Sequence, residues 1–509
     1  MTAPARSRSR PDFPAVEASL SAGEPIILSA RKPDDLLTPV AAYLKLAQAD
    51  GHACLLESVE GGAWRGRYSA IGLDPDLIWQ CRDGVASEAR GPAIEARQFT
   101  PLDSDPMTAL RAVIEDARCA LPDGAPAIAA GLFGYVGYDM VRYLEKLPET
   151  AGPDPLGTPE ACLIRPRTVV VFDALKQEIQ VYCTIRPSPG EAPRAAYDAA
   201  AARLQAALDV LAGPLPEITA PAGPTGEITS NQSEAQYRAA VDKARNYIRA
   251  GDAFQIVPSQ RFSTPFTDDS FWLYRSLRRL NPSPFLFYFR MDGFEIAGSS
   301  PEILVRLRDD TVTIRPIAGT RPRGATPAQD DALEADLLAD PKERSEHLML
   351  LDLGRNDVGR IAKPGSVRIT SRENVERYSH VMHIVSNVEG DLATGEDAVS
   401  ALFAGFPAGT VSGAPKVRAM EIIDELEPHR RGIYAGAVGY FSADGGMDTC
   451  IALRTAVIKD GRMHVQAGAG VVLDSDPESE RVETVNKAMA LFRAAEDCVR
   501  DSVKDSGRD

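Results

Sequence analysis

The chain has 509 residues and a formal charge of −16 at pH 7, with 44% hydrophobic and 25% charged residues. This composition is typical of a globular protein of roughly two to four domains, and the negative charge argues against nucleic acid or an anionic membrane surface as the main partner. The chain has neither an apolar run of membrane-spanning length nor the apolar core of a signal peptide, and its seven cysteines are widely spaced, so we expect a cytoplasmic protein with reduced thiols.

The predicted elements divide the chain into five parts. Residues 1–24 are polar and are expected to form a flexible tail. Short apolar runs separated by Gly, Asp and Pro predict a β-rich N-terminal domain over 25–185. An Ala-rich helix near 192–211 and a Pro- and Gly-rich linker occupy 186–232. The second domain, 233–496, begins with a helix that Ser233 and Gln236 cap and Gly251 ends, and a charged tail covers 497–509.

Two acidic positions stand out in the second domain. Glu346 lies on a predicted helix that Pro341 begins and Asp340 caps, and a later helix, begun by Pro477 and capped by Asp476 or Ser475, carries Glu480 and Glu483. Carboxylates from separate segments suit a hard cation such as Mg²⁺, which takes its remaining ligands from water and substrate. The same pattern also fits a solvated helix face.

On the later helix, Glu480, Glu483 and Lys487 share one face at spacing i, i+3, i+7. An ordinary Glu483–Lys487 ion pair, worth a few tenths of a kcal/mol, is therefore the alternative to a metal site.

Four further segments have the residue types of a ligand site. Small residues around Thr320 in PIAGTRPRG and at 468–470 in GAGVV permit close backbone approach to a ligand. Ser412 is predicted to cap a helix that begins near Ala414, which would form an anion site. Arg454, in the predicted strand CIALRTAVI, suits a carboxylate. Each segment also has a plain structural interpretation as a turn, a cap, an ion pair or a bulge.

His383 lies in RYSHVMHIVSNVEG, where alternation places it on one side of a strand with Val385 and Asn387, opposite Met382 and Ile384. A single histidine is more often structural than catalytic, so this position alone does not indicate a function.

Taken in order, the segments resemble the chorismate-utilising enzymes, and most closely the large subunits (component I) of anthranilate synthases. The resemblance covers nearly the whole chain. It includes LLES at 55–58, RYSAIG at 67–72, GDAFQIVPSQRF at 251–262, NPSPFLFYF at 281–289, GSSPE at 298–302, PIAGTRPRG, SEHLMLLDLGRND, MHIVSNVEG, GTVSGAPK and SDPESERVE. It implies an α+β fold with antiparallel β-sheets packed as a sandwich and helices on the outside.

The resemblance also implies a Mg²⁺-dependent lyase of tryptophan biosynthesis that converts chorismate and ammonia to anthranilate and pyruvate. By resemblance, Glu346 and Glu483 are metal ligands, with Glu480 close by or acting through water. Glu302 is the general acid for the departing hydroxyl, a role that needs a carboxyl kept protonated by burial. His383 assists hydroxyl loss and the aromatising elimination. Thr410 is the third expected catalytic residue and also helps to hold the substrate. The remaining residues expected to hold the substrate are Gln255, Thr320, Tyr434, Arg454, Gly468, Ala469, Gly470 and Lys487.

Two positions separate the sister activities of the family. Isochorismate and salicylate synthases carry a water-activating lysine where this chain has Gln255, and aminodeoxychorismate synthase has PIKGT where this chain has Ala318. The pair favours ammonia as nucleophile and anthranilate as product. Aminodeoxychorismate and aminodeoxyisochorismate synthases are the alternative enzymes, and a catalytically silent tryptophan-sensing scaffold is the alternative outside enzymes.

A second site is implied in the N-terminal half, where family members often bind tryptophan as a feedback inhibitor. The residues expected there are Glu57, Ser58, Asn281, Pro284, Phe285, Leu286, Phe287, Gly298, Ser299 and Cys450. The apolar run 284–287 is equally consistent with a core strand. No GxCxG motif of a triad glutaminase is present, so we expect ammonia from a separate glutamine amidotransferase subunit or from solution.

Overall fold

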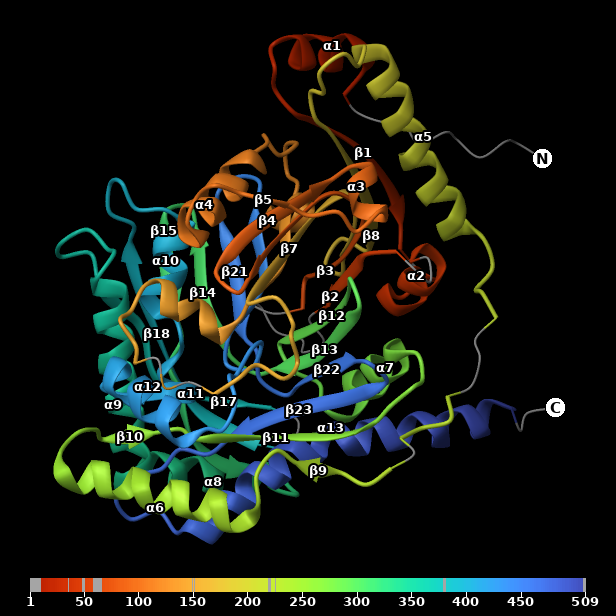
Figure 1. Cartoon of the computed structure of the whole chain (residues 1–509). Coiled ribbons are helices and arrows are strands. Elements are labelled where there is room, and N and C mark those ends of the chain that lie inside the picture. Colours follow the sequence, from red (N-terminus) through yellow and green to blue (C-terminus); the bar gives the residue numbers. More distant parts are fainter. Residues whose placement is uncertain are drawn as a thin grey trace.

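The structure is a computed structural model that describes residues 11–34, 36–47, 51–57, 66–148, 150, 152–217, 221–224, 226–378 and 381–506, with side chains up to residue 498. Ser58, one of the predicted inhibitor residues, lies outside these ranges. Strands from both halves of the sequence pair in one antiparallel network surrounded by helices (Figure 1). None of the described helices is long and apolar enough to cross a membrane.

One sheet combines N-terminal strands with strands of the second half. Its order, from edge to edge, is β1 (Ile26–Pro33), β8 (Glu178–Ile185), β7 (Ala161–Asp173), β3 (Tyr68–Arg82), β2 (Ala53–Glu57), β12 (Phe285–Met291), β13 (Phe294–Ser300), β22 (Thr455–Lys459), β23 (Arg462–Gly468), β11 (Ser259–Pro265) and β9 (Thr229–Ser230). The junction between the two halves is the pairing of β2 with β12.

A second sheet is built in the same way. Its order is β5 (Thr100–Pro101), β4 (Val85–Arg90), β3, β7, β6 (Gly131–Val136), β20 (Ala437–Ser442), β21 (Met447–Ile451), β14 (Ile303–Arg308), β15 (Thr311–Ile314) and β18 (Val381–Asp391). Strands β16 (Ile317–Pro322) and β17 (Arg368–Arg377) pair with β18 on opposite edges. A separate short pair joins β10 (Gln255–Ile256) to β19 (Gly413–Ala414).

The long strands β3 and β7 belong to both sheets. Their register shifts between Pro75 and Leu77, opposite Pro166. Proline has no N–H to donate to a ladder, so it is tolerated at such irregularities. One half of each strand continues into the first sheet and the other half into the second, which joins the two sheets into one network.

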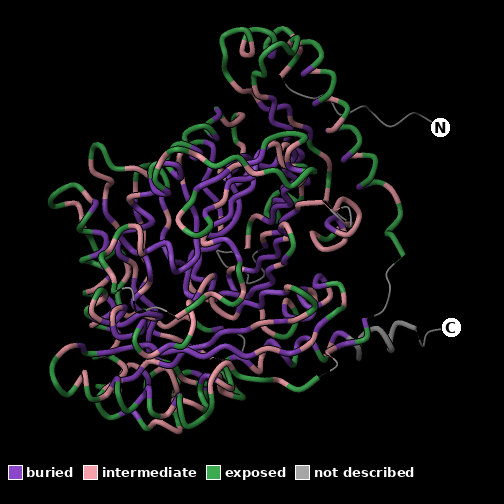
Figure 2. Tube along the Cα trace, in the orientation of Figure 1, coloured by how far each residue is buried: buried purple, intermediate pink, exposed green. Residues whose placement is uncertain are grey.

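The two sheets face each other across a shared core. Phe287 and Ile296 of the first sheet and Phe133 and Val438 of the second belong to one buried cluster. The outer face of each sheet carries a further buried cluster, shared with the helices. Together with the cluster between the sheets, these clusters make up much of the buried interior, which is purple in Figure 2. The predicted α+β class, with sandwiched antiparallel sheets and outer helices, is confirmed.

Helices cover both outer faces. Those packed on the first sheet are α1 (Phe13–Ser21), α2 (Pro39–Leu46), α5 (Pro193–Ala212), α7 (Ser270–Leu280) and α13 (Pro477–Ser506). The second sheet carries α4 (Pro106–Asp116), η2 (Tyr138–Tyr143), α10 (Ala398–Gly405), α11 (Gly409–Ser412) and α12 (Lys416–Leu426). Helices α8 (Pro327–Ala339) and α9 (Pro341–Gly359) pack on β16 and β18, α6 (Glu234–Ala250) packs on α12 and α13, and α3 (Pro92–Glu95) and η1 (Ala127–Ala129) are short turns.

Local signals placed the helix ends correctly. Ser233 and Gln236 form the predicted capping box of α6, and Gly251 ends that helix with φ +88°. Asp340 accepts from the N–H groups of Lys342 and Glu343 at the start of α9, and Asp476 accepts from Ser479 N–H at 2.9 Å at the start of α13. These caps satisfy backbone donors that a helix leaves free at its N-terminus.

Two local predictions are wrong. Ser412 does not cap a helix near Ala414: its hydroxyl donates to Ala408 O at 2.8 Å, and α12 begins at Lys416 without a side-chain cap. The intervening residues pair with β10 instead. Arg454 does not continue a strand but lies in the break between β21 and β22, with φ +47°.

The predicted domain boundaries stay a prediction, but some elements extend across them. Helix α1 lies within the segment predicted as a tail because Asp12 caps it and Val16 is buried. Helix α13 continues to Ser506, beyond the boundary at 496.

Candidate active site

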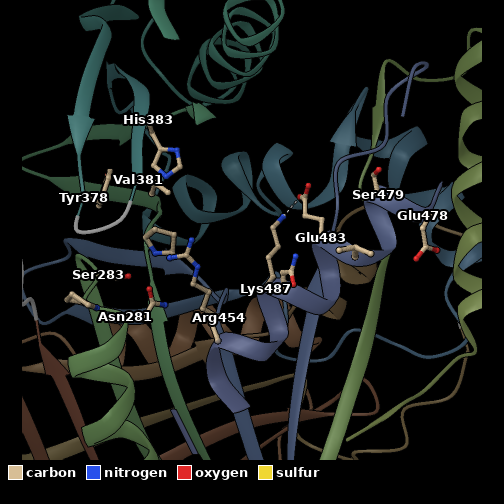
Figure 3. Close-up of a pocket in the computed structure, with 15 residues that line it drawn as sticks. Asn281, Ser283, Tyr378, Val381, His383, Arg454, Glu478, Ser479, Glu483 and Lys487 are labelled. Carbon is tan, nitrogen blue, oxygen red and sulfur yellow. Dashed lines mark ion pairs between the residues drawn. The ribbon is translucent and has the colours of Figure 1, made fainter. Parts of the chain in front are cut away.

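A cavity of about 690 Å³ brings together residues from distant parts of the chain. One side is formed by His383 of β18 and by Arg454, and the other by Glu483 and Lys487 of α13 (Figure 3). Asn281, at the end of α7, closes one end. Four of the predicted catalytic, substrate and metal residues therefore face one space.

His383 is held in a defined orientation. Its Nδ1 lies 3.0 Å from Gly319 O and 3.1 Å from the Thr320 hydroxyl. Because a carbonyl oxygen can only accept, Nδ1 carries the proton and Nε2 keeps its lone pair. Burial lowers the pKa of His383, and the charge of Arg454 lowers it further. The ring is thus a neutral base with its accepting nitrogen available.

Arg454 adopts a strained backbone conformation. A non-glycine residue at φ +47° is uncommon, and such strain is concentrated at functional sites. Burial lowers the pKa of its guanidinium, and Glu302 opposes that effect. The conformation directs a cation into the cavity, where an anionic ligand would find a rigid fork of donors.

Glu302 and Thr410 form a second pair of predicted catalytic residues. Thr410 Oγ1 donates to Glu302 Oε2 at 3.0 Å. Burial raises the pKa of the Glu302 carboxyl, although the Thr410 hydroxyl and the charges of Arg454 and Lys487 each lower it. A carboxyl of this kind keeps its proton to a higher pH than a free glutamate and can act as an acid.

The three predicted metal carboxylates are electrostatically coupled. Burial raises the pKa of Glu346 and of Glu480, and the charge of Glu483 raises both further. Glu483 itself forms an ion pair with Lys487 at 2.7 Å. Among the residues that the structure describes, no three histidine, cysteine or carboxylate side chains gather as a ready set of metal ligands.

Lys487 and Tyr434 both contact the 468–470 segment. Lys487 Nζ donates to Gly468 O at 3.0 Å. Burial raises the pKa of Tyr434 to about 12, while the N–H of Gly468 lowers it by donating to the phenol oxygen. A Cβ at Gly468 would lie 2.8 Å from that oxygen, so only glycine allows this approach.

Gln255 lies beside Glu346 of α9. Its amide donates to Glu346 and thereby lowers the pKa of that carboxyl, while its Oε1 is buried without a protein partner. A Cβ at Gly470 would lie 2.7 Å from Gln255 Nε2, and one at Gly413 would lie 2.1 Å from Gln255 O. The glycines leave room for this side chain and its backbone.

The predicted inhibitor residues lie mostly apart from this cavity, on β2, β12, β13 and β21. Glu57 accepts from Tyr274 at 2.5 Å and from Arg278 at 2.9 Å. Leu286 and Phe287 are buried in the cores, as the alternative interpretation expected. Asn281 lines the main cavity, and its carbonyl accepts from Ser299 at 2.5 Å.

Several cavity residues were not predicted. On α13, Ser479 and Asn486 stand four residues before and three residues after Glu483, a spacing that places all three on one helix face. That signal was readable from the sequence. Tyr378, whose ring centroid lies 5.5 Å from that of His383, could not have been found in this way because it follows the end of β17 and is not on a helix.

The comparisons with known proteins agree with this geometry. The family model described as chorismate binding enzyme matches residues 54–493. Anthranilate synthase component 1 of Cereibacter sphaeroides is 58% identical over 487 residues, covering 95% of this chain and 97% of that protein. The chain therefore belongs to the family of chorismate-binding enzymes.

Solved structures carry the same fold. Anthranilate synthase component I from Streptococcus pneumoniae superposes with a TM-score of 0.75 at 37% identity, covering 90% of this chain and 98% of that one. The menaquinone-specific isochorismate synthase of Escherichia coli superposes with a TM-score of 0.70 at 19% identity, covering 95% and 100%. Of these two structures, the chain is more similar to anthranilate synthase component I, both in TM-score and in sequence identity.

Proposed function

We infer that this chain is the chorismate-converting component of an anthranilate synthase, a lyase that forms anthranilate and pyruvate from chorismate and ammonia. The observation that carries the inference is the single cavity in which His383, Arg454 and the Glu483–Lys487 pair meet. The identity of 58% with a named anthranilate synthase component 1 supports it.

Chorismate carries two carboxylates, whereas this protein has a formal charge of −16. Local cations must therefore hold the substrate. Arg454 is the fork suited to one carboxylate, and Lys487 would lie beside the other. Tyr434, Thr320 and the backbone of 468–470 would contact the ring and the enolpyruvyl group.

We propose that Mg²⁺ completes the site. The donor chemistry fits, because Glu346 and Glu480 are carboxylates that lie near Glu483. Burial and the negative charge of Glu483 raise the pKa of both, and a divalent cation would relieve the repulsion among these carboxylates. Mg²⁺ needs one or two protein carboxylates and takes water and substrate oxygens for the rest. When bound, it would neutralise and orient a substrate carboxylate.

The protein's own groups would move the protons. Glu302, whose pKa burial raises, would protonate the departing hydroxyl, with Thr410 fixing its orientation. His383 presents Nε2 as a base while Gly319 holds Nδ1–H, so it would assist hydroxyl loss and accept the proton lost in the aromatising elimination.

Two residues favour ammonia and the anthranilate product. Gln255 has no basic nitrogen with which to activate water, and Ala318 lacks the amine of the PIKGT lysine. Aminodeoxyisochorismate, formed without loss of pyruvate, is the second candidate product, because the same addition of ammonia would precede either outcome.

We further propose a glutamine amidotransferase subunit as the normal ammonia source, since the relatives are named component 1. Tryptophan would inhibit by binding near Glu57, Ser58 and the 284–287 strand. The described cysteines are all free and buried, which supports a cytoplasmic location.

The decisive experiment incubates the purified chain with chorismate, Mg²⁺ and excess ammonium at a pH above about 8, where free ammonia increases, and follows anthranilate fluorescence. Formation of anthranilate that EDTA abolishes is the expected result. Chorismate loss with an aminated product that retains the pyruvate-derived carbons would identify a sister activity, and no chorismate loss would favour the silent scaffold.

A further inference from the structure

A buried ion pair contacts backbone next to several predicted site residues, and the sequence singled out neither member of the pair. Arg431 and Glu427 have side-chain exposures of only 2% and 4%, and Arg431 Nη2 lies 2.6 Å from Glu427 Oε1. The residues that line the cavity do not include either one. Burying a charge pair is costly unless its remaining polar atoms are satisfied, so the other partners of this pair indicate its role.

The guanidinium of Arg431 joins two segments of the candidate active site. Nη1 donates to Val411 O at 2.7 Å, and Nη2 donates to Val257 O at 2.6 Å. Val411 follows Thr410 directly, and Val257 is two residues after Gln255. One planar group therefore holds both backbones from behind.

The same pair reaches two further segments. Arg431 Cζ lies 5.5 Å from the ring centroid of Tyr434, whose hydroxyl contacts Gly468. Glu427 Oε1 accepts from both the N–H and the hydroxyl of Ser259, each at 2.8 Å. Ser259 is the register partner of Gly468 between β11 and β23. Both routes end at the glycine that contacts Tyr434 and Lys487.

We propose that the Arg431–Glu427 pair positions Thr410, Gln255, Tyr434 and Gly468 for the reaction without touching the substrate. The proposal rests on the proposed function. Its contacts support the segments that carry these residues, whereas the carboxylates of the proposed metal site lie on α9 and α13 and Arg454 lies before β22. Loss of the pair should therefore slow the chemical step more than it weakens chorismate binding.

The test uses Arg431→Lys and Arg431→Met in the full chain, with ammonium as nitrogen source. Lysine retains the charge but has a single nitrogen, so it cannot replace a fork that serves two carbonyls and a carboxylate. We expect kcat to fall about 100-fold in both variants, since a misplacement of about 1 Å costs that much. KM for chorismate should change less than about fivefold, because the loss of an interaction that matters only in the transition state lowers kcat without weakening ground-state binding.

Arg165→Met is the matched control. Arg165 is a buried arginine with two carboxylate partners, Asp76 and Asp116, both at 2.7 Å, and it supports β3 and α4 in the N-terminal half. Its loss should lower the unfolding temperature comparably but leave kcat of the folded protein within about threefold, because distant sites act independently. Circular dichroism and thermal unfolding would establish the folded state of each variant.

The outcomes are distinct. Retention of kcat by folded Arg431→Lys, an equal kcat loss in Arg165→Met, or a rise in KM with unchanged kcat would overturn the positioning role while anthranilate formation by the wild type stands. An inactive wild type would overturn both this proposal and the proposed function. If Arg431→Met does not fold, Ser259→Ala removes the hydroxyl that donates to Glu427 and accepts from Gln466. This variant should still lower kcat in the same direction, and an unchanged kcat there would count against the proposal.

Discussion

At the scale of single residues, burial gives two glutamates near Lys487 different properties. Glu302 and Glu483 are both glutamates next to Lys487, but burial raises the pKa of the first, while the second forms a half-exposed ion pair with Lys487. A carboxyl with a raised pKa and a carboxylate available to a cation are thus both neighbours of Lys487. The environment, not the residue type, separates the two roles.

Glu302→Gln should lower kcat by about 10²- to 10⁴-fold, the range of general acid catalysis, with a smaller change in KM for chorismate. Only protonated Glu302 is active in this role, so wild-type kcat at saturating ammonium should fall as pH rises through a pKa above the ordinary glutamate value. The variant should lack that limb of the pH profile.

The matched control for Glu302→Gln is Glu295→Gln, because burial also raises the pKa of Glu295, but its charged neighbours are Arg290 and Asp269 rather than Arg454 and Lys487. We expect its kcat to stay within about twofold of the wild type. An unchanged pH profile in Glu302→Gln would remove Glu302 from the mechanism.

At the scale of elements, the proposed metal site depends on two capped helices. Asp340 and Asp476 begin α9 and α13 at defined residues, and this sets which turn of each helix carries its glutamates. Neither helix could form the proposed site by itself, because the carboxylates of that site come from both helices.

Glu346→Gln should therefore weaken Mg²⁺ binding by at least about tenfold, since it removes a charge that the cation would neutralise. The measurement is the Mg²⁺-dependent rise in unfolding temperature without substrate, with the activation curve as a second readout. Asp352→Asn, on the exposed side of the same helix and paired with Arg355, should leave both unchanged. Equal shifts in the two variants would refute the assignment.

The pairing of β12 with β13 requires glycine at position 298, opposite Phe287. A Cβ at Gly298 would lie 2.1 Å from the ring of Phe287, which is 1% exposed. Gly298→Ala should lower the free energy of unfolding by about 1–3 kcal/mol, the usual effect of overpacking, as measured by urea denaturation. Gly359→Ala, where a Cβ would meet nothing within 4 Å, should not be destabilising. A neutral Gly298→Ala would show that the ring can move aside.

At the scale of the whole molecule, the two halves of the sequence share their sheets. β2 pairs with β12 and β6 pairs with β20, and the core between the sheets draws residues from both halves. Separating the halves would expose strand edges and apolar faces together. We therefore expect the two halves to unfold as one cooperative unit.

The three tryptophans allow a direct measurement of this cooperativity. Trp79 lies in β3, and Trp272 lies in α7. In chains that retain one of these two and carry phenylalanine at the other two tryptophan positions, fluorescence should report the same urea midpoint. Midpoints that differ by more than about 0.5 M, with m-values near 1–3 kcal/mol/M, would mean that the halves unfold separately.

Much of the site was predictable because family motifs and helix caps are local. His383, Arg454, Glu483 and Lys487 were all named from sequence and all line the cavity. The Ser412 cap failed because residues 413–414 pair with β10, a contact between segments more than 150 residues apart. The role of Arg431 was not predicted for the same reason. Beyond the nearby Glu427, its partners are the carbonyls of Val411 and Val257, which are 20 and 174 residues away in the chain.

The sequence by itself determined both ends of α6 and the starts of α9 and α13, because capping acts over a few residues. Its motifs also identified the family, and the family implied the class of fold. Only the tertiary structure decided that β3 and β7 run through both sheets, that Arg454 adopts φ +47°, and that the Arg431–Glu427 pair lies behind four site segments. These features depend on contacts between residues far apart in the chain, whose geometry is set when the sheets close around a common core.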